Sequence, residues 1–107
     1  MAVFVPDAGD LVWLTFDPQA GRRPALVLSP RSYNQKSGLA LVCPVTNQVK
    51  GYPFEVVLPP GYSVSGAILA DHLKSLDWNT RQAKRIGRIP PSALDEVLAK
   101  LAPLLGL

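Results

Sequence analysis

Eleven prolines and eight glycines are spread through the 107 residues, and they divide the apolar residues into short runs. Proline lacks a backbone N–H and glycine favours turns, so neither residue suits the interior of a long helix. Short apolar runs between such residues have the length of strands. The pattern therefore predicts many short strands joined by tight turns and disfavours a helical bundle.

Six segments have the composition expected of strands. They cover residues 11–16, 24–29, 39–45, 54–58, 67–76 and 86–89. The later half of the fifth segment alternates in polarity, so His72 and Lys74 are expected to share one face. The polar segment 32–38 is typical of a turn, and Asp77 is suited to cap a short helical turn.

The chain ends in a segment with helical spacing. Pro91 suits the first position of a helix. Apolar residues then recur at intervals of three and four positions, as Leu94, Val97, Leu98, Leu101, Leu104 and Leu105. Such a stripe packs on a sheet. With 48% hydrophobic and 18% charged residues, residues 1–107 are expected to form a single mainly β domain with a C-terminal helix (α+β), built as a small barrel.

The formal net charge of +3 permits a polyanionic partner without requiring one. Five basic residues lie close together in the C-terminal half of the sequence, at Lys74, Arg81, Lys84, Arg85 and Arg88. They could contact phosphates, or they could form the solvated face of an ordinary basic domain. The charge pattern leaves both interpretations open.

The only cysteine, Cys43, lies within an apolar segment, so we expect a buried, unreactive thiol in a reducing compartment. The N-terminus lacks the features of a secretory signal, and there is no apolar stretch of ~18 residues. A cytoplasmic protein without a membrane segment is therefore expected. One cysteine, one histidine and scattered acids show no metal-ligand spacing, so neither a metal nor a cofactor is expected.

Arg23 opens one predicted strand and Thr46 follows another. If the strands are adjacent, a guanidinium and a hydroxyl lie together at their ends, and the planar guanidinium matches phosphate oxygens. Most arginines, however, are structural or lie on the surface. Because His72 is the only histidine, an acid–base mechanism with two histidines is excluded.

Six short motifs occur in order along the chain. They are Gly-Asp-Leu-Val-Trp at 9–13, Phe-Asp-Pro at 16–18, Arg-Arg-Pro-Ala-Leu-Val-Leu-Ser at 22–29, Pro-Val-Thr at 44–46, Lys-Gly-Tyr-Pro-Phe-Glu-Val-Val-Leu at 50–58 and Ala-Asp-His-Leu-Lys-Ser at 70–75. From about residue 5 to the C-terminus the sequence resembles the MazF/PemK toxins, which are sequence-specific bacterial endoribonucleases. The resemblance implies an SH3-like barrel, MazF/CcdB-like, with a terminal helix, usually paired as a homodimer.

The resemblance also implies the activity and the residues that carry it. Arg23 and Thr46 match the catalytic pair of a metal-independent enzyme that cuts single-stranded RNA, including mRNA, to 2′,3′-cyclic phosphate and 5′-hydroxyl ends. A cognate MazE-like antitoxin, with a disordered acidic tail, is the implied protein partner. The implied RNA-binding residues are Phe16, Arg22, Asn34, Gln48, Lys50, Tyr52, His72, Lys74 and Ser75.

The chain departs from the family pattern before Arg23. Family members usually carry a longer loop there with a functional glutamate, whereas only residues 19–21 separate Pro18 from Arg22, about five residues fewer and with no acid. Either this member has lost a catalytic loop, or the sequence lacks residues of a mobile segment. We expect the second, with a break between Pro18 and Arg23.

Two other functions stay open. A gyrase-poisoning toxin like CcdB shares the fold, but that family acts through an aromatic C-terminal end, whereas this chain ends with Leu104-Leu105-Gly106-Leu107. A non-catalytic domain that binds RNA or an antitoxin is the second alternative, because the short loop lacks the family's glutamate.

Overall fold

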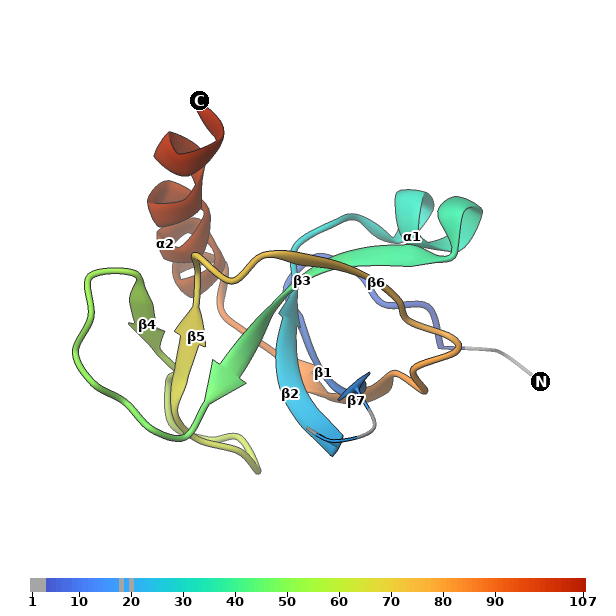
Figure 1. The fold of residues 1–107 in the computed structure, drawn as a ribbon, viewed down its shortest axis with the longest axis horizontal. Coiled ribbons are helices and arrows are strands. Elements are labelled where there is room, and N and C mark those ends of the chain that lie inside the picture. Colours follow the sequence, from blue (N-terminus) through green and yellow to red (C-terminus); the bar gives the residue numbers. More distant parts are fainter. Residues whose placement is uncertain (1–3, 18, 20) are drawn as a thin grey trace.

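The computed structural model describes residues 4–17, 19 and 21–107, and they form a curved antiparallel sheet with a helix at each of two sides (Figure 1). The strands are β1 (Asp10–Asp17), β2 (Gly21–Val27), β3 (Leu39–Thr46), β4 (Glu55–Val57), β5 (Ala67–Leu69), β6 (Lys74–Asp77) and β7 (Lys84–Arg88). The helices are α1 (Arg31–Ser37) and α2 (Pro91–Leu101), and the short 3-10 helix η1 (Ala102–Leu105) follows α2.

The main path through the sheet runs β4-β5-β3-β2-β1-β7. Strand β3 pairs with β2 along one edge, while β6 pairs with its beginning and β5 with its end. Within the described residues the end strands β4 and β7 do not pair with each other, so the sheet curls without closing. The predicted fold class, mainly β with a C-terminal helix, is confirmed, and the small barrel is an open one.

Two predictions about local structure are wrong. The predicted strand 67–76 is divided into β5 and β6, because the chain turns at residues 70–73 and the N–H of His72 donates to the carbonyl of Leu69 at 3.1 Å. The polar segment 32–38 is mostly helical instead of a turn. Helix α1 ends at Gly38, whose φ of +75° suits a glycine cap.

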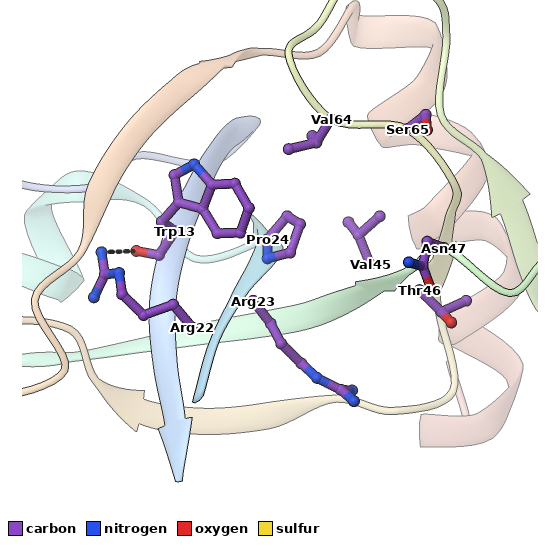
Figure 2. Close-up of a pocket in the computed structure, with 9 residues that line it drawn as sticks. All are labelled: Trp13, Arg22, Arg23, Pro24, Val45, Thr46, Asn47, Val64 and Ser65. Atoms are coloured by element: carbon purple, nitrogen blue, oxygen red, sulfur yellow. Dashed lines mark hydrogen bonds between the residues drawn. The ribbon is translucent and has the colours of Figure 1, made fainter. Parts of the chain in front are cut away.

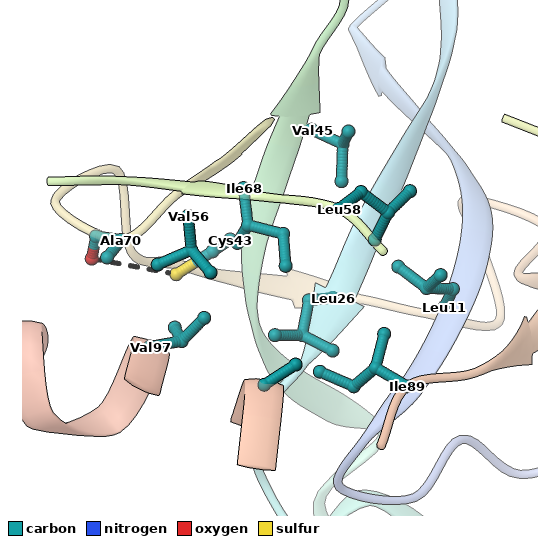
Figure 3. Close-up of a cluster of buried hydrophobic side chains, with 11 residues drawn as sticks. Leu11, Leu26, Cys43, Val45, Val56, Leu58, Ile68, Ala70, Ile89 and Val97 are labelled. Carbon is teal, nitrogen blue, oxygen red and sulfur yellow. Dashed lines mark hydrogen bonds between the residues drawn. The ribbon is translucent and has the colours of Figure 1, made fainter. Parts of the chain in front are cut away.

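Alternation along the strands divides the core into two clusters on opposite faces of the sheet. One cluster lies under α2 and is shown in Figure 3; its buried members are Leu11, Leu26, Cys43, Val45, Val56, Leu58, Ile68, Ala70, Ile89, Ala93 and Val97. The other contains Val12, Leu14, Ala25, Val27, Ala40, Val42 and Trp78. Pro91 begins α2, as predicted, and its buried residues are Ala93, Val97 and Leu101. The predicted stripe is confirmed only in part, because Leu98, Leu104 and Leu105 are exposed.

The β1–β2 hairpin closes with Asp17 opposite Gly21, after a bulge between Thr15 and Asp17. Pro18 and Ala20 lie outside the described residues, and so does the predicted break between Pro18 and Arg23. None of the helices in the described part of the chain is long and apolar enough to cross a membrane.

Candidate active site

Strand pairing brings Arg23 and Thr46 to the same place. Ala25 of β2 lies opposite Pro44 of β3. Arg23 lies two residues before Ala25 and Thr46 two residues after Pro44, so both side chains belong to the same face of the sheet. The sequence-predicted pair therefore stands where β2 begins and β3 ends.

Arg23 and Thr46 both line two neighbouring pockets, of about 430 and 340 Å³. The first pocket is completed by Trp13, Arg22, Pro24, Val45, Asn47, Val64 and Ser65 (Figure 2). The second is completed by Phe16, Asp17, Pro44, Leu69, His72 and Lys74. The two side chains thus lie at the boundary between the two pockets and line both.

Three further predicted RNA-binding residues join the pair in the second pocket. Phe16 comes from β1, Lys74 from β6, and His72 from the turn that precedes β6. Although His72 and Lys74 do not share a strand, the turn brings both to the same pocket. A guanidinium, an ammonium and an aromatic ring around one hollow can contact a nucleotide phosphate and a base.

The backbone at Thr46 is closely packed against Gly66. The carbonyl oxygen of Thr46 would lie 1.9 Å from a Cβ at residue 66, and Gly66 has a φ of +130°. Only glycine fits this approach. The side chain of Thr46 also has a partner within the protein, because its Oγ1 accepts a hydrogen bond from the N–H of Gln48 at 3.1 Å. Gly66 was missed because one glycine in a turn-rich segment carries no sign of a distant contact.

Arg22, the residue before Arg23, is held by hydrogen bonds within the protein. Its guanidinium donates to the Oγ1 of Thr15 at 3.1 Å and to the carbonyl of Gln82 at 2.7 Å. Longer bonds reach the carbonyls of Arg81 and Trp13, the last of which is drawn in Figure 2. The guanidinium joins β1 to the segment before β7, and its contact with RNA stays a prediction.

Most of the basic cluster is also used within the protein. Arg81 donates to the backbone carbonyls of Thr15 and Phe16. Arg88 donates to the buried Asp10 carboxylate at 2.9 Å, and Arg85 lies 3.9 Å from the same carboxylate. Of the cluster, Lys74 alone lines either of the two pockets. The solvated-face interpretation was also incomplete, because these arginines hold strands together.

The prediction that Asn34 contacts RNA is wrong. Asn34 is completely buried in α1. Its Oδ1 accepts from the hydroxyl of Ser29 at 2.6 Å, and its Nδ2 donates to the carbonyls of Pro6 and Ser29. The backbone carbonyl of Asn34 accepts from the Trp78 indole at 2.9 Å. A side chain with these partners has no access to a polynucleotide.

The other predicted RNA-binding residues are exposed but lie outside both pockets. Ser75 follows Lys74 on β6, opposite Leu41. Gln48, Lys50 and Tyr52 belong to the segment between β3 and β4, which begins directly after Thr46.

The remaining candidate groups offer little chemistry. Burial raises the pKa of the Cys43 thiol to about 12, with a smaller contribution from Asp71. The predicted burial of this cysteine is confirmed, and its lack of reactivity stays a prediction. Among residues 4–17, 19 and 21–107, no three His, Cys, Asp or Glu side chains are grouped so that they could hold a metal ion.

Sequence comparison identifies the family. Residues 7–105 match the family of PemK-like, MazF-like toxins of type II toxin–antitoxin systems. The chain belongs to this family. The MazF endoribonuclease toxin of Escherichia coli K12 is 50% identical over 108 residues, which cover 96% of each protein. The ChpB endoribonuclease toxin of the same strain is 34% identical over 106 residues, covering 89% of this chain and 90% of ChpB.

Solved structures agree with this PemK/MazF assignment. The crystal structure of MazF (Form-I) from Deinococcus radiodurans superimposes with a TM-score of 0.93 at 56% identity, and the match covers 98% of this chain and all of that one. The MazE–MazF structure (Form-II) from the same organism gives a TM-score of 0.92 at 56% identity, covering 98% of this chain and 99% of that one.

Proposed function

We propose that this PemK/MazF family member is a sequence-specific, metal-independent endoribonuclease that cleaves single-stranded RNA, including mRNA, as the toxin of a toxin–antitoxin pair. The observation that carries the proposal is the position of Arg23 and Thr46, side by side at the boundary of two pockets. Two relatives that are 50% identical over 108 residues, covering 96% of each chain, are named MazF endoribonucleases.

The pockets suit an internal transfer within the RNA. The 2′-oxygen attacks the adjacent phosphorus and loses its proton, while the bond to the 5′-oxygen breaks and that oxygen gains a proton. The products are a 2′,3′-cyclic phosphate and a 5′-hydroxyl. In this proposal Arg23 stabilises the negative charge that develops on the phosphorane oxygens, and the Thr46 hydroxyl donates to a non-bridging oxygen.

Partners and location follow from this activity. A close relative was solved together with MazE, so a MazE-like antitoxin is the protein partner that we propose here. We also propose a homodimer made of single-domain chains of 107 residues. Because the substrate is mRNA, the protein would act in the cytoplasm.

The cleavage experiment distinguishes this function from its alternatives. The purified protein is incubated with mixed-sequence single-stranded RNA in EDTA, and the new ends are mapped. Cleavage at one repeated motif, leaving 2′,3′-cyclic phosphates, is the expected result. Binding without cleavage would instead favour a non-catalytic domain, for which the short β1–β2 hairpin, without the family's glutamate, is the supporting observation. Inhibition of gyrase without RNA cleavage would favour a CcdB-like activity.

A further inference from the structure

The segment of residues 47–54 (the β3–β4 loop) is anchored at both ends. It leaves β3 directly after Thr46, and Figure 1 shows it extending away from the sheet before it returns to β4. At its start the N–H of Gln48 donates to the Thr46 Oγ1. At its end the N–H of Glu55 donates to the carbonyl of Tyr52 at 3.0 Å. The loop therefore connects a candidate catalytic hydroxyl to β4.

The middle of this loop is held by one carboxylate. The Glu55 Oε1 accepts hydrogen bonds from three successive backbone N–H groups, those of Lys50 at 3.1 Å, Gly51 at 2.7 Å and Tyr52 at 3.2 Å. Successive N–H groups that converge on an anion form a nest. The φ of +78° at Gly51 is one that glycine adopts without strain. The carboxylate thus selects one backbone conformation of the loop.

In this conformation the loop presents an aromatic ring and a cation to solvent. Tyr52 is 60% exposed. The Lys50 Nζ lies 5.8 Å from the centroid of the Tyr52 ring. Exposed rings stack on bases of single-stranded RNA, and a neighbouring ammonium contacts the phosphates. The loop therefore offers a second candidate surface for a nucleotide, beyond the two pockets.

On the basis of the proposed function, we infer that Glu55 is a positioning residue for RNA binding. Its carboxylate orders the β3–β4 loop so that Tyr52 and Lys50 engage nucleotides next to the cleaved bond. A carboxylate close to a phosphate-binding surface would ordinarily repel RNA. Here the negative charge is directed toward three backbone N–H groups, which explains why an acid is useful at this position.

The test measures kcat and KM separately on one RNA oligonucleotide that contains the mapped cleavage site. Glu55→Ala should raise KM on the order of tenfold, the effect of losing one base-stacking contact, while kcat stays within about threefold. Tyr52→Ala should raise KM to a similar extent and likewise leave kcat within about threefold. The double variant should raise KM by less than the product of the two single effects, because Glu55 acts through Tyr52.

Two further variants control for charge and for general structure. Glu55→Gln keeps one acceptor oxygen and should recover part of the wild-type KM. Glu96→Ala removes an exposed acid from α2, so it should leave KM within about twofold of the wild-type value. Circular dichroism at the assay temperature verifies that every variant is folded.

Three results would overturn the inference. They are an unchanged KM in Glu55→Ala, a fall in kcat without a rise in KM, and fully multiplicative effects in the double variant. In each of these cases the wild-type protein still cleaves RNA and the proposed function stands. Absence of cleavage by the wild-type protein would refute the proposed function, and this inference with it.

Discussion

Two adjacent arginines on β2 have different surroundings because successive side chains of a strand point to opposite faces. Arg22 donates to four acceptors on β1 and on the segment before β7. Arg23 belongs to the other face and lines both pockets with Thr46. The two side chains are chemically identical and both line the first pocket, so the groups that each one meets from its face of the strand distinguish the hydrogen-bonded arginine from the candidate catalytic one.

Arg23→Ala should slow RNA cleavage at least a hundredfold. The guanidinium is a fixed positive charge beside the proposed transition state, and removing one such stabilising group costs about 3 kcal/mol. Single-turnover cleavage assays would measure the loss. Lys36→Ala is the matched control, because it removes a positive charge from the exposed last turn of α1, and it should cleave at nearly the wild-type rate. Near-wild-type cleavage by a folded Arg23→Ala variant would show that the site is assigned wrongly.

Helix α1 shows how a polar segment becomes part of the core. The helix is seven residues long, too short to be stable alone. Asn34 attaches it to the N-terminal segment and to the chain after β2, through the carbonyls of Pro6 and Ser29. The Trp78 indole adds a bond to the helix backbone. Tertiary hydrogen bonds therefore stabilise a helix that local propensity does not predict.

Asn34→Ala should lower the free energy of unfolding by about 3 kcal/mol or more, because it leaves several buried polar groups without partners. Urea denaturation would measure this change. At a temperature where the variant is folded, its KM for RNA should match that of the wild type. A raised KM with unchanged stability would contradict the buried role of Asn34.

The assembled fold leaves apolar side chains exposed near its C-terminal end and on β4. They are Val57, Leu98, Leu104, Leu105 and Leu107, with Leu107 the most exposed at 87%. The predicted helix stripe is thus only partly covered by the sheet. Exposed apolar surface of this kind usually marks an interface.

A homodimer is the expected state. Light scattering at tens of micromolar should give a mass of twice 11.5 kDa, and the mass should not change with moderate salt because the exposed surface is apolar. A monomer at that concentration would contradict the prediction. An antitoxin that binds without inhibiting cleavage would contradict the proposed role of the partner.

Some features of the site could be predicted from the sequence, and others could not. Arg23 and Thr46 were found from their places at the ends of two apolar runs and from the family motifs, and the structure brings them together. The burial of Asn34 could not be predicted, since its partners Pro6 and Trp78 are 28 and 44 residues away. Similarly, nothing near Gly66 in the sequence indicates the Thr46 carbonyl that excludes a side chain there.

The features that could be predicted are those that depend on residues close together in the sequence. The apolar runs of β1, β2 and β3 and the helical spacing after Pro91 depend on neighbouring residues, so these strands and α2 could be predicted from the order of amino acids. Whether a polar side chain faces RNA or the interior depends on which distant backbone groups need a hydrogen bond, because a buried polar group without a partner is costly. That need arises only when the sheet has curled and its segments have met, so the tertiary structure decided which groups surround Arg22, Arg23 and Asn34.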